Sequence, residues 1–215
     1  ISLIAINAGL AGTLTARVAD ATELVNLSLS QNMLEGAIPK SIDQLTKVTA
    51  LDLSNNLLSG PIPHELTAMT SLINLNLSVN QLTGQLPDLS QLSDLKYLLI
   101  THNLLDGDIP GSITQLTKLV FLELYKNKLS GSIPSDIGNL IELNHLCLND
   151  NTLTGTIPAS LKDLTQLKRL WLNDNDISGV VHDGICELPI DWQSTDFNVT
   201  NNQLCPDYPT CISAH

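Results

Sequence analysis

Residues 51–63 read Leu51-Asp52-Leu53-Ser54-Asn55-Asn56-Leu57-Leu58-Ser59-Gly60-Pro61-Ile62-Pro63, and variants of this stretch recur along almost the whole chain. Successive units are 24 residues apart, except for steps of 23 before Leu98 and 27 before Phe197. Such a period predicts a stack of similar coils in which each coil contacts only its neighbours. The nine units, numbered here as coils one to nine, begin at Leu3, Leu27, Leu51, Leu75, Leu98, Leu122, Leu146, Leu170 and Phe197.

Each unit opens with two leucines separated by one residue. Because side chains alternate along a strand, this pattern predicts a short strand whose leucines point inward while the flanking residues face water. A glycine and a proline follow, as at Gly60 and Pro63, and predict a bent return segment that joins no central ladder. Apolar residues such as Ile42, Leu45 and Val48 then close the coil.

A recurring asparagine stands where each predicted strand ends. Its side-chain amide both donates and accepts, so it can satisfy backbone groups at the turn. We therefore expect a ladder of stacked asparagines along the coils. Its members are Asn32, Asn56, Asn80, Asn103, Asn127, Asn151, Asn175 and Asn202.

The Leu-x-Gly-x-Ile-Pro pattern resembles the plant-type leucine-rich repeat of receptor-like kinase ectodomains and polygalacturonase-inhibiting proteins, over residues 3–204. The resemblance implies an α/β solenoid. It would be a right-handed superhelix of about nine coils with a concave parallel β-sheet and convex 3₁₀ and loop segments. We expect one domain over 1–215, with an irregular first coil at 1–26, regular repeats at 27–181 and a capping coil at 182–215. The Cys-Pro-Asp-Tyr-Pro-Thr-Cys ending at 205–211 is similar to the caps of secreted microbial and algal members.

Charge and hydropathy exclude several classes of partner. The formal net charge is −12 and the pI is near 4.5, which argues against nucleic acid and anionic membranes, since both attract a basic face. The sequence holds no run of 18 apolar residues, so we expect no transmembrane segment. Ile1, Ile4 and Ile6 lie in an uncapped first coil, which predicts either a trimmed chain or a cap supplied by another molecule or a neighbouring subunit.

The four cysteines predict one disulfide near the C-terminus. Aligning the last two coils places Cys211 close to Cys186, so that pairing is favoured, with Cys205–Cys211 as the alternative. Cys147 lies two coils away, on a strand, and is expected to be a free thiol. Disulfide use points to an oxidising compartment and hence to an extracellular or cell-surface location.

Three Asn-x-Ser/Thr sequons are candidate glycosylation sites. The repeat itself favours Asn-Leu-Ser, which is an alternative origin for two of them. The candidates are Asn26, Asn76 and Asn198.

The residues that flank the inward leucines predict the binding face. Coils two to four carry Ser, Asn, Ala and Asp there, whereas coils five to eight carry four of the seven aromatic residues. Aromatic and arginine side chains are enriched at binding hot spots, so we expect a protein, peptide or cell-wall glycan partner. The alternative interpretation is that the rings only cover neighbouring strands as cross-strand pairs. The candidate ligand-binding residues are Tyr97, Leu99, His102, Phe121, Glu123, Tyr125, Lys126, His145, Arg169, Trp171 and Asn173.

Catalysis, metal binding and cofactor binding are not expected. Glu123, His145 and Cys147 form the most enzyme-like group, but an open sheet offers neither an enclosed pocket nor oxyanion donors. An unactivated Cys147 should react like an ordinary free thiol. The other histidines, His64, His182 and the terminal His215, are expected to be surface residues.

The sequence leaves three functions in competition. The first is a non-catalytic extracellular recognition module that uses the face of coils five to eight. The second is a structural or adhesion component of a cell-surface assembly or fibre, which would self-associate. The third is ice binding, known for one plant protein of this subclass, but the return segments vary too much to favour it.

Overall fold

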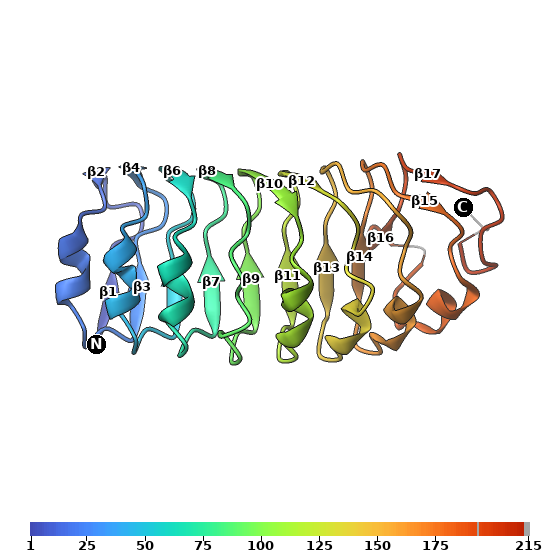
Figure 1. The fold of residues 1–215 in the computed structure, drawn as a ribbon, viewed down its shortest axis with the longest axis horizontal. Helices are drawn as coiled ribbons and strands as arrows, with labels where there is room; N and C mark the ends of the chain where they lie inside the picture. The colour runs from blue at the N-terminus through green and yellow to red at the C-terminus, as the bar shows by residue number, and fades with distance from the viewer. Residues whose placement is uncertain (193, 213–215) are drawn as a thin grey trace.

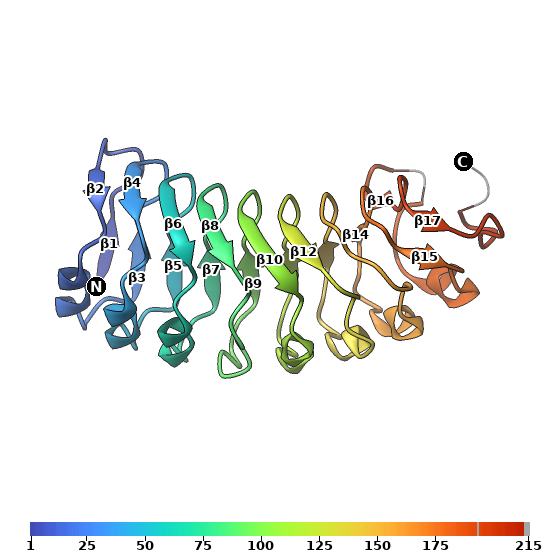
Figure 2. The ribbon, with the colours of Figure 1, turned by 45° about the horizontal axis from the view of Figure 1, so that its top comes forward.

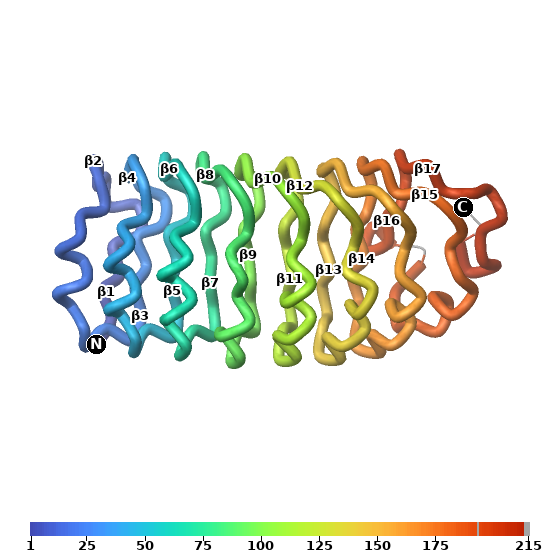
Figure 3. The backbone as a smooth tube through the Cα atoms, in the orientation of Figure 1, coloured from blue at the N-terminus to red at the C-terminus, as the bar shows by residue number. Residues whose placement is uncertain are grey.

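The computed structural model describes residues 1–192 and 194–212, so His215 lies outside the described residues. The coils stack side by side into an elongated molecule, with the N-terminal coil at one end and the C-terminal coils at the other (Figure 1). The backbone passes through each coil in the same direction, from a strand, through a loop, to the return segment (Figure 3).

The predicted parallel sheet is present, and over the described residues its nine strands lie side by side in sequence order. Neighbouring strands keep the register of the repeat, so that Leu27 pairs with Leu51 and Leu51 with Leu75. The strands are β1 (Ser2–Ile4), β3 (Asn26–Ser28), β5 (Ala50–Asp52), β7 (Asn74–Asn76), β9 (Tyr97–Leu99), β11 (Phe121–Glu123), β13 (His145–Cys147), β14 (Arg169–Trp171) and β16 (Phe197–Asn198).

The asparagine ladder forms as predicted. In coil three, the Asn56 oxygen accepts from the backbone N–H of Leu34, 3.0 Å away, and its amide nitrogen donates to the carbonyls of Leu29 and Leu53 at 3.0 and 3.1 Å. Equivalent bonds recur at Asn103 and Asn151. Each ladder residue therefore ties one coil to the next where the strand ends.

A second set of strands, not predicted from the sequence, follows the first. The return segments were expected to join no ladder. Around the Leu-x-Gly stretch, however, the backbones of neighbouring coils pair in parallel. Figure 2 shows these strands beside the main sheet. The glycines of this stretch in coils one to eight have φ between 67° and 88°, as expected. The strands are β2 (Ala11–Thr13), β4 (Met33–Gly36), β6 (Leu57–Pro61), β8 (Gln81–Gly84), β10 (Leu104–Asp108), β12 (Lys128–Ser130), and the separate pair β15 (Ser178–Gly179) and β17 (Gln203–Leu204).

Short 3₁₀ helices line the opposite side of the coils (Figure 1). Coil four has none among its described residues, because it is one residue shorter than the others and replaces the helix by a turn in which Asp88 accepts from the Ser90 N–H. The helices are η1 (Ala16–Asp20), η2 (Lys40–Gln44), η3 (His64–Ala68), η4 (Gly111–Gln115), η5 (Ile137–Asn139), η6 (Ala159–Asp163) and η7 (Asp183–Glu187).

The core is a continuous stack of leucine, isoleucine and valine between the sheet and the 3₁₀ side. Its two ends differ. At the N-terminal end, Ile1 and Ile4 are 78% and 62% exposed, as their position in coil one predicts. At the C-terminal end, Cys186 and Cys211 form a disulfide with 5.6 Å between Cα atoms, the favoured pairing, while Cys205 is free and exposed. Among the described residues no helix is long and apolar enough to span a bilayer.

Candidate ligand-binding face

We call the outward side of the nine-stranded sheet over coils five to eight the aromatic face; it consists of the eleven candidate residues named above. Strand register brings them together, because Tyr97, Phe121 and His145 are direct neighbours on β9, β11 and β13. Leu99 and Glu123 are likewise paired. The face is therefore one contiguous surface and not a set of separate exposed rings.

One row of the aromatic face runs across three strands. The Tyr97 ring meets the Phe121 ring edge to face, with 5.2 Å between centroids. Phe121 in turn stacks on the His145 imidazole, with 4.1 Å between centroids and planes 3° apart. His145 Nδ1 lies 3.1 Å from Glu123 Oε1, which fixes the plane of the imidazole. These contacts hold the rings in one arrangement before any ligand arrives.

A second row crosses the face diagonally. His102 meets Tyr125 edge to face at 5.3 Å, and Tyr125 meets Trp171 at 6.3 Å, although coil seven lies between their coils. Cys147 lies on the intervening strand β13, next to Trp171 in the sheet register, and is only 1% exposed, so we infer that the Tyr125 and Trp171 rings cover it. Cys147 is a free thiol, as predicted, but burial raises the pKa of the thiol far above its usual range, so we expect it to react more slowly than an exposed thiol.

The C-terminal edge of the face is held by the loop that precedes β16. Arg169 donates from Nε and Nη2 to Asp196 Oδ1, at 2.8 and 2.7 Å, and its guanidinium lies 4.7 Å from the centroid of the Trp171 ring. The Trp171 indole N–H donates to the Thr195 carbonyl at 2.7 Å. Asp196 and Thr195 were not among the predicted site residues, although the 27-residue step before Phe197 signalled a longer loop at this point.

The edge where the strands end carries His102, Lys126 and Asn173. His102 and Lys126 adopt left-handed backbone conformations, with φ of 52° and 56°. Burial, and secondarily the Lys126 ammonium, lower the pKa of His102, while burial raises the pKa of the Tyr125 phenol. Asn173 donates to Asp174 at this edge.

The enzyme-like group does not have the properties of a nucleophilic site. Glu123 and His145 are in contact, but a thiol whose pKa is raised by burial is not a ready nucleophile. Across residues 1–192 and 194–212, no three His, Cys, Asp or Glu side chains are placed to hold a metal ion.

The three sequon asparagines lie on the same sheet surface and already make hydrogen bonds. Asn26 donates to Ser2, Asn76 accepts from the Ser78 N–H, and Asn198 accepts from the Thr200 hydroxyl and N–H. Asn198 is next to Trp171 in the sheet register. A glycan there would therefore border the aromatic face.

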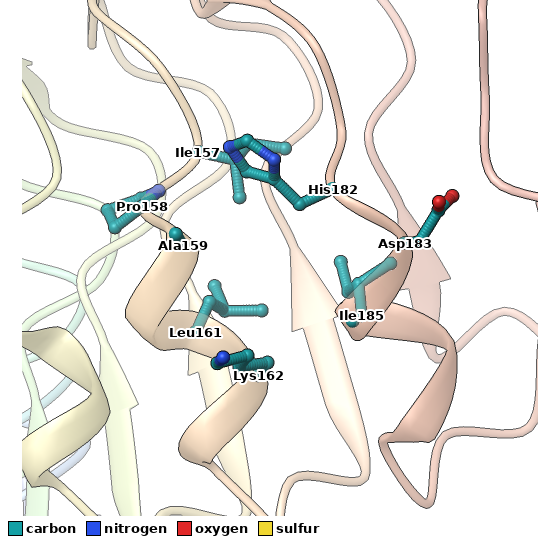
Figure 4. Close-up of a pocket in the computed structure, with 9 residues that line it drawn as sticks. Ile157, Pro158, Ala159, Leu161, Lys162, His182, Asp183 and Ile185 are labelled. Carbon is teal, nitrogen blue, oxygen red and sulfur yellow. The ribbon is translucent and has the colours of Figure 1, made fainter.

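A cavity of about 320 Å³ lies on the opposite side of the molecule, between η6 and η7. Figure 4 shows Leu161 and Ile185 facing one another across it, with the His182 ring near Ile157 at one end. It marks the junction between the last regular coil and the capping coil, and none of the predicted site residues lines it.

His64 and His182 are exposed, as expected.

Comparison with known proteins decides the family. Family models described as leucine-rich repeat match residues 22–83 and the segments 118–140, 142–164 and 166–188, together more than half of the chain. The chain belongs to the leucine-rich repeat family. No curated protein matches it in sequence.

Among solved structures, this leucine-rich repeat chain is similar to plant receptor ectodomains. The GASSHO1/SCHENGEN3 ectodomain from Arabidopsis thaliana, in complex with CASPARIAN STRIP INTEGRITY FACTOR 2, is 34% identical over 91% of this chain and 23% of that chain, with a TM-score of 0.85. The Arabidopsis HAESA ectodomain in complex with an IDA peptide hormone is 34% identical over 91% of this chain and 33% of that chain, with a TM-score of 0.84.

A plant ice-binding protein is also similar, at 30% identity over 97% of this chain and 66% of that chain, with a TM-score of 0.81. The chain spans about a third or less of the GASSHO1/SCHENGEN3 and HAESA ectodomains. These likenesses confirm the plant-type leucine-rich repeat and the right-handed solenoid with a concave parallel sheet and convex 3₁₀ segments.

Proposed function

We propose that this chain is a non-catalytic, extracellular or cell-surface recognition module that binds a partner on the aromatic face. The observation that carries the proposal is the preformed arrangement of Tyr97, Phe121, Tyr125 and Trp171 over four adjacent coils. Rings that are ordered in the free protein lose little side-chain entropy on binding, so their contact area is converted efficiently into affinity.

The nature of the face favours an extended ligand. Its rings follow the sheet across the coils, and a chain lying along it could place successive apolar groups against Tyr97, Phe121 and Trp171. The similar HAESA and GASSHO1/SCHENGEN3 ectodomains were solved with peptide ligands or factors bound, which supports a peptide or protein partner here. A cell-wall glycan is the alternative, because sugar rings also stack on aromatic side chains.

The alternative interpretation of the rings as cross-strand pairs is compatible with this proposal. The rings do contact one another, as that interpretation requires. They are only half-buried, however, while the aliphatic core beneath is closed without them. Their remaining surface is therefore available to a partner.

The sequons fit the division of the sheet surface into polar coils two to four and aromatic coils five to eight. We propose that Asn26 and Asn76, if modified, cover coils two and four and leave coils five to eight open. Glycopeptide mass spectrometry of the secreted protein tests occupancy at each sequon, and full occupancy at Asn198, beside Trp171, would argue against a ligand at that end of the face.

Binding to peptide and glycan arrays tests the proposal. We expect the protein to retain a subset of probes and to lose them, by about tenfold or more in affinity, when Phe121→Ala or Trp171→Ala truncates a central ring. The matched control is Asp52→Ala, on the polar part of the same sheet, which should leave binding unchanged. Equal effects from the control, or none from the ring variants, would contradict the proposal.

Two measurements separate this function from its competitors. A structural or fibre component self-associates, so a stable monomer by light scattering disfavours that role. Ice binding requires a regular row of hydroxyl or amide side chains. The residue before the glycine of each Leu-x-Gly stretch instead alternates irregularly between acidic and hydroxyl side chains, so we expect no thermal hysteresis. These residues are Glu35, Ser59, Thr83, Asp106, Ser130, Thr154 and Ser178.

A further inference from the structure

Glu123 is a carboxylate in the middle of the aromatic face. Phe121 and Tyr125 flank it on its own strand, two residues away on the same side of the sheet. Leu99 and Cys147 are its register partners on β9 and β13. Its side chain is 19% exposed, so rings and apolar side chains have replaced most of its water.

The protein supplies this carboxylate with one hydrogen bond. His145 Nδ1 lies 3.1 Å from Glu123 Oε1, and because an ionised carboxylate only accepts, Nδ1 carries the proton. This contact orients the carboxylate; it is a hydrogen bond to a full negative charge when the imidazole is neutral and an ion pair when the imidazole is protonated. Glu123 Oε2 has no hydrogen-bond partner among the residues that the structure describes.

Neither Arg169 nor Lys126 forms an ion pair with Glu123 among the described residues. Arg169 is committed to Asp196, with two contacts of 2.7 and 2.8 Å. Lys126 is exposed at the strand-end edge and forms no ion pair with Glu123 in the described part of the chain. Because Arg169 is paired with Asp196, it is not free to bind a carboxylate of a ligand. The unpaired Lys126 ammonium lies at the strand-end edge of the face, whereas the Glu123 carboxylate, bonded only to His145, lies in its middle between Phe121 and Tyr125.

We infer that Glu123 receives a cationic side chain, arginine or lysine, from an extended basic peptide; this inference rests on the proposed function. The rings of Phe121 and Tyr125 stand on either side of the carboxylate, where a guanidinium or ammonium group would gain cation–π contacts as well as the ion pair. The net charge of −12 would also steer a basic ligand toward the protein.

A neutral ligand fits this site less well. Covering Glu123 with a sugar or an apolar side chain would remove its remaining water without supplying a positive charge, and burying an unpaired charge is costly. The site therefore selects a basic peptide segment, with apolar groups on both sides of the cation, over a neutral glycan.

Two decapeptide libraries with randomised flanks test the inference. The fifth residue is arginine in one library and citrulline, its uncharged isostere, in the other. We expect the protein to bind members of the arginine library about tenfold more tightly than their citrulline counterparts. Glu123→Gln, which keeps the side chain's size, should abolish that preference. Glu35→Gln, which removes an exposed acid from the second sheet, should keep it.

Trp171→Ala separates failure of this inference from failure of the proposed function. If Trp171→Ala weakens binding of both libraries equally while arginine and citrulline peptides bind alike, the aromatic face binds peptides but Glu123 does not select a cation. If neither library binds and the variants change nothing, the proposed peptide-binding function itself is wrong. A preference for arginine that survives Glu123→Gln would also overturn the inference.

Discussion

The rings of Tyr125 and Trp171 meet edge to face across a whole coil, with 6.3 Å between their centroids. Adjacent strands of a sheet are about 4.8 Å apart, so two large side chains can bridge an intervening strand only if that strand presents small residues beneath them. Coil seven does so with Cys147 and Asn149, which are both buried. The aromatic face is thus built from two layers, with small side chains under large ones.

The covering rings should protect the Cys147 thiol. In a Cys205→Ser background, which removes the exposed thiol, we expect maleimide to alkylate Cys147 slowly, because it is buried and its thiolate is disfavoured. Trp171→Ala should raise the alkylation rate by about tenfold, measured by peptide mass spectrometry. Tyr97→Ala, which removes a ring from the other row, is the control. Equal acceleration by both variants would mean that general loosening exposes the thiol.

The repeat made most of this fold predictable, because a period of 24 residues and a strand period of two together determine where each residue points. Tyr97 and Phe121 lie side by side on the sheet, where the register placed them. The second sheet was missed for a physical reason. Its strands are two to five residues long, and most of them contain or adjoin a positive-φ glycine, so no alternating pattern reveals them.

The contacts within the aromatic face were less predictable. Whether Cys147 is exposed depends on the rotamers of Tyr125 and Trp171, which are distant in sequence and whose meeting no pattern records. The pairing of Arg169 with Asp196 depends on the path of a lengthened loop. Sequence register therefore gave the members of the face, while side-chain packing decided which of their groups a ligand can reach.

The asparagine ladder should carry a large share of local stability. Asn56→Ala would leave the buried Leu34 N–H unpaired, while the Leu53 carbonyl would keep its bond from Asn80, and we expect a loss of roughly 2 kcal/mol in the free energy of unfolding. Asn32→Ala removes the ladder residue of coil two, whose partners Ala8 and Leu10 lie in the exposed first coil, where water can replace the lost bonds, and it should cost less. Urea denaturation compares the two, and equal losses would contradict a buried-bond explanation.

Val79 occupies a strained backbone position that a substitution should relieve. The residue before each ladder asparagine has positive φ, 56° at Val79, and five of the nine equivalent residues are Asn or Asp. A β-branched side chain is poorly suited to this conformation. We expect Val79→Asn to stabilise the protein by about 1 kcal/mol in urea denaturation. Val25→Asn, at an exposed valine with ordinary φ, is the control and should give no gain.

His102 should make stability depend on pH in the weakly acidic range. Its pKa is lowered below the ordinary value of 6.5 in the folded protein, first by burial against Tyr125 and then by Lys126, with Asp150 opposing. The folded state therefore favours the neutral ring. Its contribution to stability is complete above pH 6.5 and is lost as pH falls below 6.5 toward the lowered pKa, because the unfolded chain binds the proton more readily.

Replacing His102 by asparagine removes this titration and keeps a residue that tolerates φ of 52°. Between pH 7.5 and 5.5 we expect the urea midpoint of the His102→Asn variant to fall less than that of the unmodified protein. This range lies above the ordinary pKa values of carboxylates, so acids such as Asp174, whose pKa is lowered by Asn173 and Asn201, do not contribute to the difference. His182→Asn, at an exposed histidine, should retain the full pH dependence. A His102→Asn variant that loses as much stability as the unmodified protein would show that His102 is not the group responsible.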